Sequence, residues 1–224
     1  NGVIEKTSQA TSQGLVISLM VDGRYSGHST SDLRKEAVEA FVKRAVDATR
    51  VLEPDEDRRQ IALDKMGSNP IDELDLFDPS EPVTGGQLRE KITDFESEVQ
   101  ARKSPDLVSA TAHIWTSNSH GFTAFSNGFS GSSQSTSFGL GGEVAMLEES
   151  GKRPEASAFF STRHKSDQPS RSMIAETLWE RAGEVTKSGA GPSGKFPMFL
   201  SNRVAGKVVG SLLGAMSGVA IWQG

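Results

Sequence analysis

The stretch "LVSATAHIWTSNSHGFTAF" (residues 107–125) decides the fold class, because here the apolar spacing changes from a helical period to a period of two. Runs rich in Thr, Phe, Val and Ser follow one another, separated by clusters of Gly, Asn and Ser. They cover residues 107–117, 121–129, 133–147 and 155–164. This pattern predicts successive antiparallel strands, that is, a β meander.

Two histidines, serines and an asparagine crowd into residues 113–125 of this stretch. Strand alternation places His113 on the same face as Thr111 and Trp115, and we interpret "SNSHG" as the turn after the first strand, since Asn and Gly favour turns. The alternative is a role in binding or chemistry. On that alternative, Asn118, Ser119 and His120 are the candidate substrate-binding residues.

Catalytic and metal-binding residues are not predicted for this segment. The four histidines are scattered, and neither HExxH nor HExxxH occurs. The glycine-rich "GAGPSGKF" (residues 189–196) resembles part of a phosphate-binding loop, but Phe196 replaces the Ser or Thr that would bind magnesium. Nucleotide hydrolysis there is a third alternative, which calorimetry with ATP and magnesium would test.

The residues before the meander predict local elements of both kinds. "GLVISLMVDGRYSG" predicts a hairpin with Asp22-Gly23 as its turn. Residues 29–52 predict an amphipathic helix capped by Ser31 or Asp32. Prolines and carboxylates at 53–86 predict an irregular acidic surface connection, and residues 84–105 predict a second amphipathic helix.

After the meander, the spacing of Ile174, Leu178, Ala182 and Val185 predicts a further helix, and "KFPMFL" (residues 195–200) predicts a short edge strand. A glycine-striped helix capped by Asn202 and then a final apolar strand or turn close the chain. The fold class is therefore α+β. We expect two domains: an N-terminal α/β layer at 1–104 that includes the acidic connection, and the meander plus a helix-strand-helix unit at 105–224.

The composition excludes several classes of function. A net charge of −5 and the absence of Lys/Arg clusters argue against nucleic acid and anionic membranes as partners. The chain has no cysteine, and its first residues do not have the pattern of a signal peptide, so we expect a cytoplasmic protein. Gly206, Gly210, Gly214 and Gly218 recur on one face, but the uncharged run there is shorter than the roughly 20 residues of a membrane span.

Several of these stretches, in this order, resemble the TldD/TldE family, whose TldE members are also called PmbA or modulators of DNA gyrase. "GLVISLMVDGRYSGHSTSDL" is similar to the strand, Asp-Gly-Arg turn and Ser-Thr helix start of the family, and "ELDLFDPS" to its acidic connection. "TSNSHGF" is similar to its Asn-Ser-x-Gly turn, and the stretch from Asn202 to Gly224 to the helix that closes its first half.

The resemblance implies a cytoplasmic metallopeptidase assembly that acts on unfolded peptides. In it a TldD subunit supplies an HExxxH zinc site, and a TldE subunit completes the substrate cavity. Because that motif lies beyond the end of this sequence, we expect a piece of the family chain and carry over no zinc ligand. The Ser-rich strands favour the TldE-like subunit, partnered by a TldD-like chain or by itself as a homodimer. The alternative is a non-enzymatic α+β binding or scaffold protein.

Overall fold

The computed structural model describes residues 2–67, 74–187, 189 and 191–223. It divides into two compact units, residues 1–187 and 188–224, which are treated separately below. Both sheets are antiparallel, and the strands of each sheet follow one another along the chain without a helix between them. The predicted α+β class is therefore confirmed. The expected domain boundary at residue 104 stays a prediction.

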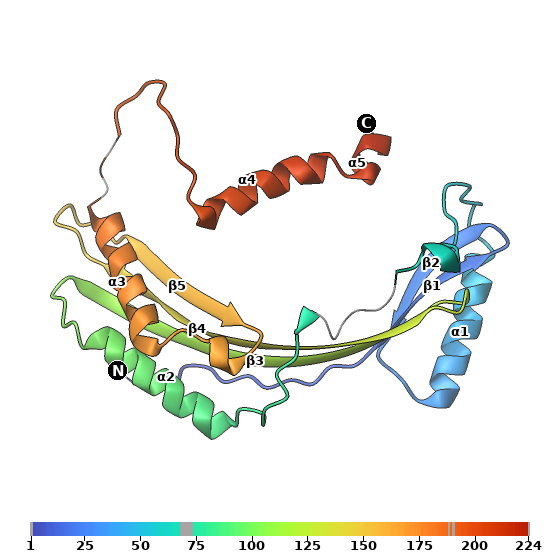
Figure 1. Ribbon diagram of the computed structural model, residues 1–224, viewed down its shortest axis with the longest axis horizontal. Helices are drawn as coiled ribbons and strands as arrows, with labels where there is room; N and C mark the ends of the chain where they lie inside the picture. Colours follow the sequence, from blue (N-terminus) through green and yellow to red (C-terminus); the bar gives the residue numbers. More distant parts are fainter. Residues whose placement is uncertain (1, 68–73, 188, 190, 224) are drawn as a thin grey trace. The chain divides into compact units, whose positions relative to one another are not determined.

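The first regular element of the first unit is the predicted hairpin (Figure 1). Strands β1 (Leu15–Val21) and β2 (Arg24–Thr30) pair from Leu15↔Thr30 to Val21↔Arg24. Asp22 and Gly23 both have positive φ, 50° and 74°, which gives the strand-to-strand turn the twist that a two-residue hairpin needs. The hairpin prediction is confirmed.

Helix α1 (Lys35–Thr49) packs against this hairpin, but its predicted cap is wrong. The N-cap residue is Arg34, and no side chain caps the helix. Asp32 instead accepts hydrogen bonds from the Arg34 backbone N–H at 3.2 Å and from its guanidinium Nε at 2.9 Å. These bonds, the side-chain one foremost, lower the pKa of Asp32 to about 2. The Asp32 carboxylate thus lies two residues before the N-cap position and is already hydrogen-bonded to Arg34.

Within this connection, residues 53–67 and 74–84 are largely exposed and irregular, as predicted, with a 3-10 turn at Leu63–Lys65. Helix α2 (Gly85–Gln100) then begins with a complete capping box. The Thr84 hydroxyl accepts from the Gln87 N–H at 3.3 Å, while the Gln87 side chain accepts from the Thr84 N–H at 2.8 Å. Two otherwise free N–H groups are satisfied at the helix start.

The meander is a three-stranded sheet of order β3-β4-β5, with β3 (Leu107–Ala124), β4 (Ser130–Met146) and β5 (Glu155–Thr162). The predicted turn at "SNSHG" is wrong, because β3 continues through residues 117–121, which pair with Ser133–Ser137. The chain turns at Asn127-Gly128, where Gly128 has φ 98° and the Phe125 N–H donates to the Phe129 carbonyl at 2.9 Å. The first two predicted strands are therefore one strand.

Helices α2 and α3 (Arg171–Thr186) cover one face of this sheet (Figure 1). The predicted stripe of α3 is confirmed: Ile174, Leu178 and Ala182 are buried, and Val185 packs at the margin. They meet Phe95 and Val99 of α2. Trp179 donates its indole N–H to the Val99 carbonyl at 3.0 Å, so the buried ring has a polar partner as well as apolar ones.

On the face of the sheet that α2 and α3 do not cover, two aromatic rings pack directly against glycines. Trp115 lies against Gly139, and a Cβ there would overlap its ring; Phe159 lies in the same way against Gly141. The rings of His113 and Phe159 are 5.8 Å apart. Because His113 and Trp115 share this face, the alternation predicted for them is confirmed.

The second unit holds α4 (Asn202–Ala215) and α5 (Gly218–Gln223). Two predictions there are wrong. Lys195–Leu200 is not a strand, since Phe196, Met198 and Phe199 are exposed and Pro197 lacks an N–H to donate. The final apolar segment is helical, and Ser201 rather than Asn202 is the N-cap residue. Of the glycine-rich segment 189–196, Ala190 lies outside the described residues, as does Ser188 before it.

None of the helices in the described ranges combines the length and the hydropathy needed to cross a bilayer.

Candidate functional site

The free edge of β3 borders a groove. Because β3 is the first strand of the sheet order β3-β4-β5, only one of its edges pairs with β4. A groove of about 920 Å³ follows residues 107–114 of this strand. Its other walls are α2 and residues 2–8, which run in extended form past the strand (Figure 1). At about 3.3 Å per residue, the lined part of β3 is roughly 25 Å long, which fits an extended peptide of seven or eight residues.

The walls of this groove, called the β3 groove below, combine apolar and polar side chains. Leu88 and Ile92 of α2 line it beside Arg89, Thr93 and Glu96. The N–H of Gly2 donates to Glu96 Oε1 at 3.1 Å, which fastens the N-terminal wall to α2. The groove can therefore hold a main chain along the strand and accommodate varied side chains on its helical wall.

The sheet protects its other edges. Arg181 of α3 donates to the carbonyl of Ser157 on β5 at 2.7 Å. Beyond the end of β5, the carbonyl of Leu76 accepts from the N–H of Thr136 on β4 at 3.0 Å. In contrast, the 18 residues of β3 contain no charged residue and no proline, the usual devices that keep an edge from pairing. The β3 edge thus lacks the features that would hinder pairing with another strand.

The structure places the predicted substrate-binding residues on β3, beyond the groove. Asn118, Ser119 and His120 are exposed and pair with Thr136, Ser135 and Gln134. His113 and His120 stand seven residues apart, about 23 Å along a strand, and an odd number of residues sends them to opposite faces. They do not form one site. Contact of Asn118, Ser119 and His120 with substrate stays a prediction.

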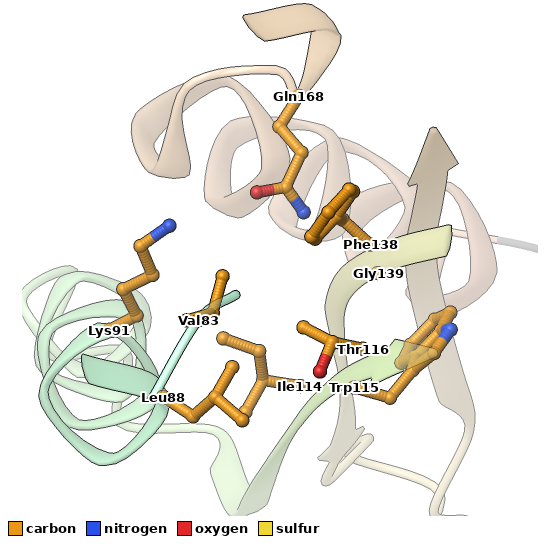
Figure 2. Close-up of a pocket in the computed structure, with 9 residues that line it drawn as sticks. All are labelled: Val83, Leu88, Lys91, Ile114, Trp115, Thr116, Phe138, Gly139 and Gln168. Carbon is orange, nitrogen blue, oxygen red and sulfur yellow. The ribbon is translucent and has the colours of Figure 1, made fainter. Parts of the chain in front are cut away.

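A second, much smaller hollow lies between α2 and the start of α3, over the helical face of the sheet (Figure 2). Val83, Leu88, Ile114 and Phe138 form its apolar lining, and Lys91, Thr116 and Gln168 bring polar groups to it; Trp115 and Gly139 complete it. Its volume of about 10 Å³ has room for roughly one water molecule. It is too small for a peptide or a cofactor.

Within the described ranges, no group of three or more His, Asp or Glu side chains is arranged to hold a metal ion. His28 lies 2.8 Å from Ser26 Oγ on β2, His113 packs against Phe159, and His164 follows β5. The described residues therefore do not offer the ligand set that catalytic zinc requires.

The family description "PmbA/TldA metallopeptidase domain 1" matches residues 1–49, which hold the hairpin and α1. A candidate modulator of DNA gyrase from Bacteroides thetaiotaomicron has a similar structure, with a TM-score of 0.82 and 26% sequence identity over 96% of this chain. The sequence match and the structural similarity both support the resemblance to the TldD/TldE/PmbA family.

Two more distant solved structures share the fold. A candidate modulator of a DNA gyrase from Thermotoga maritima gives a TM-score of 0.62 at 14% identity over 87% of this chain. TldE from Thermococcus kodakarensis gives 0.59 at 15% identity over 83%. The chain spans 49%, 42% and 40% of these three relatives' lengths, about half or less of each. None of the curated proteins matches the sequence.

Proposed function

We propose that this chain is the TldE-like part of a cytoplasmic peptidase assembly, and that its β3 groove holds the unfolded peptide which the assembly cleaves. The observation that carries the proposal is the uncharged free edge of β3 beside a groove about as long as a short extended peptide. Main-chain pairing to such an edge needs no particular side chains, so it suits unfolded peptides of varied sequence.

In the proposed assembly, zinc is bound by another subunit or by another part of the protein. When bound by a TldD-like subunit, zinc polarises the scissile carbonyl and activates water. The described residues of this chain do not fit a zinc site, so their part is to bind and orient the peptide. The partner is accordingly a TldD-like subunit, or a second copy if the remainder of the protein supplies the metal.

Backbone N-methylation of the substrate tests the pairing directly. In a strand added to β3, alternate N–H groups point at β3, and methylating three of them removes three hydrogen bonds without changing any side chain. At about 1 kcal/mol each, this loss lowers kcat/KM by roughly a hundredfold. A peptide methylated at the intervening positions is the matched control and should be cleaved normally. Equal cleavage of both peptides contradicts strand addition.

Two substitutions in α2 test whether the peptide binds in the β3 groove. Thr93 lines the groove and is exposed, so Thr93→Trp fills it without disturbing the core. Glu90 is exposed on the same helix and does not line the groove, so Glu90→Trp is its control. With the TldD-like partner present, the first variant should lose peptide cleavage and the second should keep it.

Metal chelation distinguishes a zinc peptidase from the alternative, a non-enzymatic binding protein. Cleavage by this chain alone that survives a chelator contradicts the zinc assembly. Peptide binding in the β3 groove without any cleavage, even with a TldD-like partner, favours the non-enzymatic binding protein instead.

A further inference from the structure

The segment Leu74–Glu81, called the strap below, is fastened across the ends of β4 and β5. The last pair of these two strands is Phe138↔Thr162. Two residues before Phe138 on β4, the Thr136 N–H donates to the Leu76 carbonyl of the strap at 3.0 Å. Beyond the end of β5, the strap therefore takes its place beside β4 and forms one backbone hydrogen bond with it.

One end of the strap is fixed by a buried polar network. The Thr136 hydroxyl accepts from the Asp78 N–H at 2.9 Å and donates to the Arg163 carbonyl at 2.7 Å. Asp78 in turn accepts from the N–H groups of Lys165 and Ser80, each at 2.8 Å. These bonds, first of all that from the Lys165 backbone, lower the pKa of Asp78 to about 2. This end stays ionised and bonded throughout the neutral range.

The other end is fixed by a histidine. His164 Nε2 lies 2.9 Å from the carbonyl oxygen of Asp75 and 3.1 Å from its carboxylate Oδ1. The His164 side chain is 19% exposed, whereas that of Asp75 is 82% exposed. Asp75 has φ 47°, a left-handed conformation uncommon for residues other than glycine. A titratable ring thus contacts both the backbone and the side chain of a residue in this conformation.

We propose that His164 is a pH-responsive clasp: protonated, it holds the Asp75 end of the strap on the sheet, and neutral, it lets that end open and uncover the Thr136 N–H. The inference is independent of the peptidase function. Its outcome is a second free edge on the sheet, on the side away from β3.

The charges around the ring favour the protonated form in the closed strap. The carboxylates of Asp75, Asp78 and Asp167 face His164. The nearby cations are occupied elsewhere, since Arg163 donates to the Thr136 carbonyl and Lys165 Nζ to the Glu81 carbonyl. The bond to the Asp75 carbonyl, more than these charges, raises the pKa of His164. Because it is raised in the closed form, the extra stability is present at low pH and lost as pH rises through it.

Amide hydrogen exchange of the Thr136 N–H measures the opening. The rate is corrected for intrinsic exchange and compared between pH 5.5 and pH 8.0, with the Leu178 N–H of α3 as the reference for global unfolding. We expect several-fold more opening at pH 8.0, because the protonated ring, which the closed strap favours, opposes opening at pH 5.5.

Variants assign the effect to the clasp. His164→Gln should abolish the pH dependence, and Asp75→Asn, which tolerates a positive φ, should reduce it. His120→Gln, an exposed histidine on β3, should leave it unchanged. Equal corrected opening at both pH values in the native chain, or an unchanged pH dependence in His164→Gln, overturns the proposal. Should these variants not fold, NMR titration of the native His164 ring decides, and a pKa at or below 6.5 overturns it.

Discussion

Replacing Gly142 by alanine should destabilise the first unit, although alanine usually stabilises a strand relative to glycine. Gly142 lies opposite Ala112 on the helical face of β4. A Cβ there would lie 2.7 Å from the Thr111 carbonyl oxygen, 3.2 Å from Phe95 and 3.6 Å from Leu178. The carbonyl belongs to the paired strand and Phe95 and Leu178 are fully buried, so none of them moves away without loss of packing.

The size of the effect follows from overpacking. Forcing a methyl group into a filled core costs about 1–3 kcal/mol. For a chain of this length, each kcal/mol shifts Tm by about 2–4 °C. Gly142→Ala should therefore lower the free energy of unfolding by about 1–3 kcal/mol and Tm by up to roughly 10 °C.

Gly183 provides the matched control. It lies in α3, and a Cβ there meets nothing within 4 Å. Gly183→Ala should raise the free energy of unfolding by about 0.5–1 kcal/mol, because glycine is a poor helix former. Urea unfolding followed by circular dichroism measures both changes. If Gly142→Ala stays within about 0.5 kcal/mol of the native chain while Gly183→Ala stabilises, the close approach of β3, β4 and the helices is refuted.

Two further predictions concern the connection and α2. Thr84→Ala removes half of the capping box with Gln87 and should lower the free energy of unfolding by about 0.5–2 kcal/mol in urea titrations; no change would mean that the cap is not formed in solution. The lowered pKa of Asp78 means that its stabilising bonds are present above about pH 4 and are lost as pH falls towards 2. Asp78→Asn should accordingly be less stable near neutral pH and should lose less stability between pH 5 and 2; an acid limb as steep as that of the native chain would contradict this role.

Local signals in the sequence were sufficient for most elements. The Asp22-Gly23 turn and the apolar stripes of α1, α2 and α3 depend on neighbouring residues only, and these elements form as predicted. The failure at 117–121 has a physical reason: Ser, Asn and Gly favour turns in isolation, but residues 133–137 offer a full set of strand partners. The Asn127-Gly128 pair, the stronger hairpin signal, was present in the sequence.

Other features depend on partners that spacing cannot reveal. "KFPMFL" has strand-forming residues but no strand beside it within the described residues, so it stays irregular. The β3 groove joins residues 2–8 to a strand about a hundred positions away, and the clasp joins Asp75 to His164 across 89 positions. Such neighbours are set by the tertiary fold.

Gly139, beneath the ring of Trp115, also selects the alignment of β3 with β4. If β3 slid by two residues in one direction, the faces of the sheet would be kept, but Trp115 would meet Ser137 rather than Gly139. The indole would then lie over Ser137, whose Cβ would overlap the ring as a Cβ at Gly139 would in the present alignment. Long Ser/Thr-rich strands pair with themselves almost equally well in several alignments. The missing side chain of Gly139 thus removes one competing alignment that the alternation of polar and apolar residues leaves open.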